Sequence, residues 1–134
     1  MTKRRPTTTL AVSPTVIECE KNEVHFAGMD TAVMLADLRS STIVPYQVKG
    51  ESMGRTIRNG ACAWIDTKDR AVVSGEVYVV CLPLQGAVIK RLYINGKGVK
   101  CSSDNPEFSD FDIPFSEIED NFVVGRVKWV LQPV

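Results

Sequence analysis

The sequence has no excess of either charge, only one histidine and no long apolar run. Its 16 Lys and Arg residues balance 16 Asp and Glu residues, so it lacks the basic excess with which a domain grips a nucleic-acid backbone. No stretch reaches the roughly 20 apolar residues of a membrane-spanning helix. The start, MTKRRPTTTLAVSP, is too polar for the core of a secretory signal. These absences predict a cytoplasmic protein without a membrane partner.

Metal-binding patterns are also missing. The cysteines have no CxxC spacing and His25 is the only imidazole, whereas zinc sites usually combine closely spaced Cys and His ligands. We therefore expect no metal and no cofactor. The cysteines are expected to be reduced core thiols, at positions Cys19, Cys62, Cys81 and Cys101.

The length of 134 residues and the apolar content of 44% suit one soluble domain with a real core. Residues 1–40 are expected to form a flexible N-terminal arm, in which Met34, Leu35 and Leu38 have the spacing of a short helix. Residues 41–134 are expected to be the folded domain. Two successive amphipathic helices, which a helix–turn–helix needs, are absent, so contact with operator DNA would require a separate domain.

Beyond residue 41 the pattern is that of strands. Apolar and polar residues alternate over 43–49 and 121–132, and Pro45 indicates an edge strand or a bulge. Residues 76–82 are apolar on both faces, which predicts a central strand. Further strands are expected over 62–66, 86–94 and 97–101. The sequence therefore predicts an all-β domain of sandwich or barrel type.

The connections between these strands carry their own signals. Residues 76–82 and 86–94 are expected to pair as a hairpin around Gln85 and Gly86. Asn95-Gly96 is typical of a type I′ turn leading into the next strand. The stretch SSDNPEFSDF, 102–111, is expected to be a polar loop.

Ser52 is the candidate nucleophile. It stands in VKGESMG between Gly50 and Gly54, at the exit of an apolar run, which places it in a tight turn. Backbone amides of such a turn, with Gly50 and Met53 as the candidate supports, could form an oxyanion hole. Glycine-flanked serines are also common in ordinary turns, so this motif alone is weak evidence.

Lys90 is the candidate general base. In GAVIKRLYI it shares a strand face with Val88, Leu92 and Ile94, whereas Arg91 falls on the opposite face. A lysine can take a serine proton near neutral pH only if burial lowers its pKa, from roughly 10.4, by about 3 units. The structural alternative is that Lys90 extends to the surface or pairs with Asp66 or another carboxylate.

Six motifs occur in an order that resembles the LexA-type S24 peptidases, the C-terminal domains of SOS and phage repressors and the UmuD mutagenesis proteins. The resemblance extends over roughly residues 43–130. It is carried by VKGESM, RNG, VVSGEVYVV, VIKRL, SSDNPEF and VVGRVKW.

The resemblance implies a bent antiparallel β domain, like those of LexA and signal peptidases, that dimerises. It also implies an autoprotease that stays dormant until RecA filaments on single-stranded DNA promote its self-cleavage. The family's nucleophile falls on Ser52 and its general base on Lys90. The family usually has a proline soon after its S-M pair, where Gly54-Arg55 stands here, which leaves a slow or degenerate protease open.

Members of the family cut their own Ala-Gly or Cys-Gly bond upstream of the serine. The corresponding pair here is Ala27-Gly28. Its gap to the serine, 52 − 27 = 25 residues, is short for the family. A chance dipeptide in a linker is the alternative.

Three roles remain open from the sequence. A UmuD-like protein would shed its arm and dimerise to bind a translesion polymerase. The C-terminal domain of a CI-like phage or prophage repressor would assemble on operator DNA through a separate helix–turn–helix, with cleavage as the off switch. A third possibility is a non-catalytic dimerisation module that retains only the fold.

Overall fold

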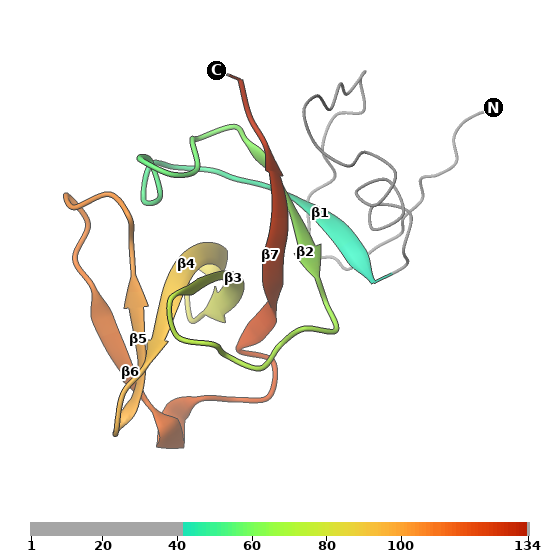
Figure 1. Ribbon diagram of the computed structural model, residues 1–134. Helices are drawn as coiled ribbons and strands as arrows, with labels where there is room; N and C mark the ends of the chain where they lie inside the picture. The colour runs from blue at the N-terminus through green and yellow to red at the C-terminus, as the bar shows by residue number, and fades with distance from the viewer. Residues whose placement is uncertain (1–41, 134) are drawn as a thin grey trace.

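The computed structural model describes residues 42–133, which form one antiparallel sheet of seven strands (Figure 1). The strand order is β1-β2-β7-β3-β4-β5-β6. In the described part of the chain the only helix is the short 3-10 turn η2, Phe115–Glu117. The strands are β1 (Ile43–Gln47), β2 (Cys62–Asp66), β3 (Glu76–Leu82), β4 (Gly86–Ile94), β5 (Gly98–Ser102), β6 (Phe111–Pro114) and β7 (Val123–Leu131).

The expected all-β fold is confirmed, and the main strands lie where the alternation places them. β3 lies between β7 and β4 and has buried residues on both faces, as its apolar run predicts. Among the described strands β1 is an edge strand that pairs only with β2. This accommodates Pro45, because an edge position leaves the missing N–H without a required partner. The hairpin of β3 and β4 is also confirmed.

Two local expectations are wrong. The stretch 102–111 is not all loop, because Ser102 ends β5 and Phe111 begins β6, a strand of four residues that is too short to show a clear period. The turn after β4 is not type I′, since neither Asn95 nor Gly96 has positive φ. Instead the Asn95 carboxamide oxygen accepts the N–H groups of Lys97 and Gly98, and this side chain takes over the role of the special backbone geometry.

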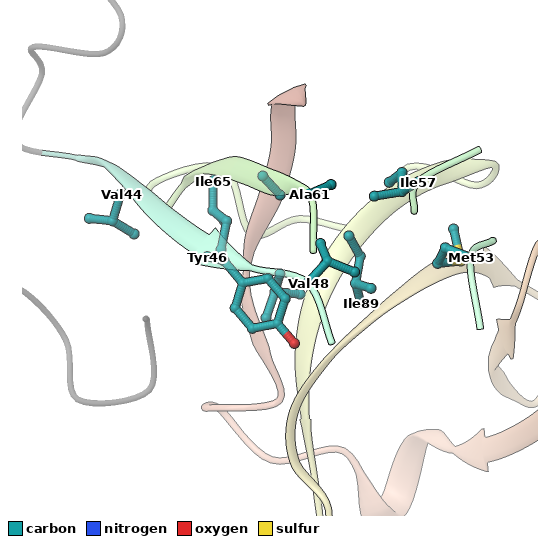
Figure 2. Packing of buried hydrophobic residues seen from close by; sticks show 10 residues of the cluster. Val44, Tyr46, Val48, Met53, Ile57, Ala61, Ile65 and Ile89 are labelled. Atoms are coloured by element: carbon teal, nitrogen blue, oxygen red, sulfur yellow. The ribbon is translucent and has the colours of Figure 1, made fainter. Parts of the chain in front are cut away.

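The sheet curls so that distant strands share a core. Tyr46 on β1 donates its hydroxyl to the carbonyl oxygen of Ala87 on β4, 3.0 Å away, although three strands separate β1 from β4 in the sheet. Figure 2 shows Val48, Ile57 and Ile89 gathered in this core. A second core on the other side of β3 and β4 contains Tyr78, Val80, Leu92, Val99 and Cys101.

Gly125 on β7 shows how the central strands approach. A Cβ at this position would lie 2.4 Å from the carbonyl oxygen of Asp66 on β2, so a side chain there would clash with the backbone. The register of β7 against β3 shifts between Val79 and Val80, next to Gly125. Bulges of this kind increase local twist and bend, which is consistent with the curl of the sheet.

The structure also bears on the expectations for the cysteines and for membrane-spanning helices. Cys81 and Cys101 are free thiols, but Cys62 is disulfide-bonded, so the expectation of reduced cysteines is wrong for that residue. Residues 42–133 contain no helix that is long and apolar enough to cross a membrane. The proposed arm, its short helix and the Ala27-Gly28 bond lie outside the described residues.

Candidate active site: Ser52, Lys90 and the loop that joins them

Ser52 lies in the connection between β1 and β2, which closes on itself as a compact loop. The N–H of Val48 bonds to the carbonyl oxygen of Ala61 at 2.9 Å, and the N–H of Gly60 bonds back to Val48 at 2.8 Å. Gly50 has a φ of +94°, a conformation that glycine adopts without steric cost. Its N–H donates to the Asn59 side-chain oxygen at 2.8 Å, so Gly50 supports the turn and its amide is already engaged.

Met53 fixes the loop to the core. Its side chain is 1% exposed and packs in the same cluster as Val48, Ile57 and Ile89, a burial worth about 1.5–3 kcal/mol. The neighbouring Ser52 is half-buried. In residues 42–133 no partner is recorded for the N–H groups of Ser52 and Met53, so both remain available as oxyanion donors.

Lys90 lies in the middle of β4 and is 8% exposed. It faces Tyr78 on β3, and its Nζ donates to the hydroxyl oxygen of Ser103 at 2.8 Å. Burial lowers the pKa of Lys90 below its ordinary value, and Cys101 and Asp110 oppose that shift. Among the described residues Lys90 makes no ion pair, and it is buried. Both alternatives are therefore wrong: Lys90 neither extends to the surface nor pairs with Asp66 or another described carboxylate.

The link between serine and lysine is the three-residue stretch Ser103–Asn105, called here the SDN segment. The hydroxyl of its first residue, Ser103, accepts a hydrogen bond from the Lys90 amine. Its last donates its backbone N–H to the carbonyl oxygen of Ser52 at 2.9 Å and its side-chain amide to Glu51 at 2.9 Å. Figure 1 shows the connection after β1 and the loop between β5 and β6 on the same side of the molecule.

This arrangement brings the two candidate residues to one segment, but not into direct contact. The Cα atoms of Ser103 and Asn105 are at most about 7.6 Å apart, because each trans peptide spans 3.80 Å. Among the described contacts, no hydrogen bond joins the Ser52 hydroxyl to the Lys90 amine. Catalytic hydrogen bonds are often loose before substrate binds, so the placement is compatible with a nucleophile and its base.

The middle residue of the SDN segment forms an ion pair next to this pair. Asp104 accepts two hydrogen bonds from Arg91, at 2.9 and 2.7 Å, and one from the Thr56 hydroxyl at 2.5 Å. These bonds, led by that with Arg91, hold the pKa of Asp104 below its usual value, and the Asp104 bond raises that of Arg91. Asp104 therefore ties the serine loop to β4.

Sequence reasoning missed all three residues of the SDN segment as parts of the site. SSDNPEF was recognised only as a polar loop and a family motif. The available signal was a short run of hydrogen-bonding side chains at the end of a strand. Their partners become evident only when β5 is aligned with β4.

Within residues 42–133 no group of three or more His, Cys, Asp or Glu side chains could hold a metal ion. The chemistry that the site offers is that of a hydroxyl, an amine and backbone amides.

A curled antiparallel sheet that connects a loop serine and a buried lysine through one segment is the arrangement expected of a serine–lysine peptidase. The comparison with protein families agrees: the Peptidase S24-like family model matches residues 13–128. The chain therefore belongs to the S24 family of serine peptidases, with a LexA-like fold. A comparison with curated proteins found no match.

Proposed function

We propose that this protein is a self-cleaving serine–lysine peptidase, with Ser52 as nucleophile and Lys90 as general base. The observation that carries the proposal is the burial of Lys90 on β4, without a carboxylate partner in residues 42–133, beside the segment that holds Ser52. Burial disfavours the ammonium form, and a serine hydroxyl needs a neutral base to become nucleophilic.

The proposed reaction proceeds in two stages. The Lys90 amine takes the Ser52 hydroxyl proton as the oxygen attacks the carbonyl carbon of Ala27, and the N–H groups of Ser52 and Met53 stabilise the oxyanion. The Ala27-Gly28 bond then breaks, and the Lys90 ammonium gives its proton to the Gly28 amine. Water hydrolyses the acyl-enzyme by the same proton transfers, which restores Ser52 and leaves a carboxylate on Ala27.

The proposed setting is the SOS response in the cytoplasm. In this setting the protein would act as a homodimer, and RecA filaments would stimulate its cleavage. Release of the arm would allow a UmuD-like protein to bind a translesion polymerase. In the second setting, cleavage would inactivate a CI-like repressor that reaches operator DNA through a separate helix–turn–helix domain.

The test is alkaline incubation of the purified full chain, followed by intact-mass measurement. A rise in pH deprotonates Lys90, so the expected product is a fragment that begins at Gly28. Ser52→Ala and Lys90→Met should abolish it, and RecA filaments should accelerate it near neutral pH. If wild type stays intact under both conditions, or if Ser52→Ala is cut equally well, the proposed Ser52–Lys90 peptidase is wrong. An intact wild type would favour the alternative of a non-catalytic module with the peptidase fold.

A further inference from the structure

The contact between Lys90 and Ser103 follows from strand register. β4 and β5 pair Arg91 with Ser102 and Leu92 with Cys101. The same register places Ser103, one residue beyond the end of β5, opposite Lys90. Opposed residues in an antiparallel ladder share a face, so the Ser103 hydroxyl reaches the buried face that carries the lysine. Each of the two residues is 8% exposed.

The partner that register supplies is a neutral one. A carboxylate in this place would favour the ammonium form and raise the pKa of Lys90, as Asp104 does for Arg91 on the next rung. The Ser103 hydroxyl accepts the hydrogen bond without adding a negative charge. Lys90 can therefore be held in place while burial still lowers its pKa.

The other groups around Lys90 are consistent with this arrangement. Tyr78 faces it from β3, but the tyrosine oxygen is engaged with Ala71 and Val73. Cys101 on β5 and Asp110 beyond it both act to raise the pKa of Lys90, and burial outweighs them. Within residues 42–133 the amine has one hydrogen-bond partner, the hydroxyl of Ser103.

We propose that Ser103 is a positioning residue for the general base, an inference that rests on the proposed function. A neutral amine has two N–H donors and one lone pair. Donation of one N–H to Ser103 fixes the amine and leaves its lone pair for the Ser52 proton. The ammonium formed by that transfer keeps the same bond to Ser103 until its new proton passes to the leaving amine.

The experiment measures the self-cleavage rate of the full chain against pH for Ser103→Ala, Ser103→Thr and Ser103→Asp. Loss of the hydroxyl should lower the alkaline limiting rate about tenfold, the typical loss for one hydrogen bond. The midpoint should also move to lower pH, because an ammonium loses more than an amine when its acceptor is removed. Threonine should restore the rate, and aspartate should move the midpoint to higher pH.

The matched control is Ser102→Ala, one residue earlier, whose hydroxyl bonds to Asp110 at an exposed position. It should leave the limiting rate within about twofold of wild type, because surface substitutions rarely act strongly. If Ser103→Ala cleaves with the wild-type rate and midpoint, the positioning role is wrong although the peptidase stands. The positioning role is also wrong if Ser103→Ala and Ser103→Asp move the midpoint of the pH profile in the same direction.

A second readout needs no cleavage. The pKa of Lys90 can be followed by NMR of labelled lysine side chains in a Ser52→Ala background, alone and combined with each Ser103 variant. The pKa should fall with alanine and rise with aspartate. If wild type never cleaves and these shifts occur, the proposed function fails and the hydrogen bond is upheld. Identical Lys90 pKa values in the Ser52→Ala background and in its combinations with Ser103→Ala and Ser103→Asp overturn the inference, whatever the cleavage result.

Discussion

Lys90 and Arg91 are adjacent cations on β4 that meet opposite environments. Lys90 is buried, bonds to the Ser103 hydroxyl and has a lowered pKa. Arg91 is half-buried on the other face, bonds twice to the Asp104 carboxylate and has a raised pKa. Both partners come from the same segment after β5.

The difference shows that the partner's charge, together with burial, decides what a cation does. A carboxylate fixes Arg91 in its charged form, which suits a structural tie between the serine loop and β4. A hydroxyl leaves Lys90 free to lose its proton, which suits a base. One residue step along a strand exchanges the two roles, because consecutive side chains point to opposite faces.

The largest expected effect comes from breaking the structural member of this comparison. Arg91→Met removes both bonds to Asp104 and the bond to the Gly75 carbonyl oxygen. It leaves the Asp104 carboxylate, which is 14% exposed, without its arginine and with only the Thr56 hydroxyl as a described side-chain partner. The free energy of unfolding should fall by about 2–4 kcal/mol, measured by urea denaturation at pH 7.

The control for that substitution is Arg126→Met. Arg126 forms ion pairs with Glu76 and Asp69, but those pairs are more exposed, and surface pairs contribute about 0–1 kcal/mol. A loss for Arg126→Met as large as that for Arg91→Met would contradict the structural role given to Asp104.

The second effect is smaller and has the opposite sign. Lys90→Met removes a buried amine whose charged form burial disfavours, so at pH 7 the variant should be as stable as wild type or more stable by about 1 kcal/mol. The free energy of unfolding of the wild-type chain should increase as pH rises from the lowered pKa of Lys90 in the folded state to the ordinary value of 10.5. In this pH range the unfolded state binds more protons than the folded state.

The gap between Lys90→Met and wild type should therefore close as pH rises, provided that the fold survives alkaline solution. Urea denaturation at a series of pH values measures it. A Lys90→Met variant that loses stability as heavily as Arg91→Met at neutral pH would show that the lysine is a structural cation like its neighbour.

The smallest expected effect concerns the thiol next to Lys90. Burial raises the pKa of Cys101 to about 11, and Lys90 opposes the shift. With that pKa only about 0.1% of the thiol is ionised at pH 8, and the thiolate is the reactive form. Cys101 should react with a thiol reagent far more slowly than the partly exposed Cys81, as followed by peptide mapping.

The same measurement sharpens the comparison of the two cations. Lys90→Met should slow the labelling of Cys101 further, because it removes the charge that lowers the pKa of this thiol. Arg91→Met should not change the labelling rate of Cys101 by this route, because Arg91 lies on the opposite face and the charge of Lys90 is unchanged. Rapid labelling of Cys101 in the folded wild type would show that solvent reaches the buried thiol next to Lys90.

Local pattern was enough for much of this structure. Alternation placed Lys90 and Arg91 on different faces of β4 before any fold was known, because the side-chain period of a strand is fixed. The continuous apolar run of β3 indicated a strand covered on both sides, and the structure confirms it. The glycines around Ser52 indicated a turn, and Gly50 has the positive φ that favours glycine.

The pairing of strands that are remote in the chain could not be predicted from the sequence. The insertion of β7 between β2 and β3 depends on how remote faces pack, and no local signal encodes it. The partner of Lys90 depends on the β4–β5 register, which a turn sets, and the type assigned to that turn was wrong. β6 was missed because Phe111 and Ile113 give only two apolar positions in a polar stretch.

The length of the turn between β4 and β5 sets which residue of the second strand lies opposite Lys90. Asn95 closes the turn by a backbone bond to Gly98 and by its side chain, in an exposed place five residues from Lys90. A single residue inserted there would shift the pairing of β5 against β4 by one residue, which turns every side chain of β5 to the other face of the sheet. A sequence neighbour of Ser103 would then lie opposite Lys90 in its place. The spacing of an exposed turn thereby selects the chemical partner of a buried amine.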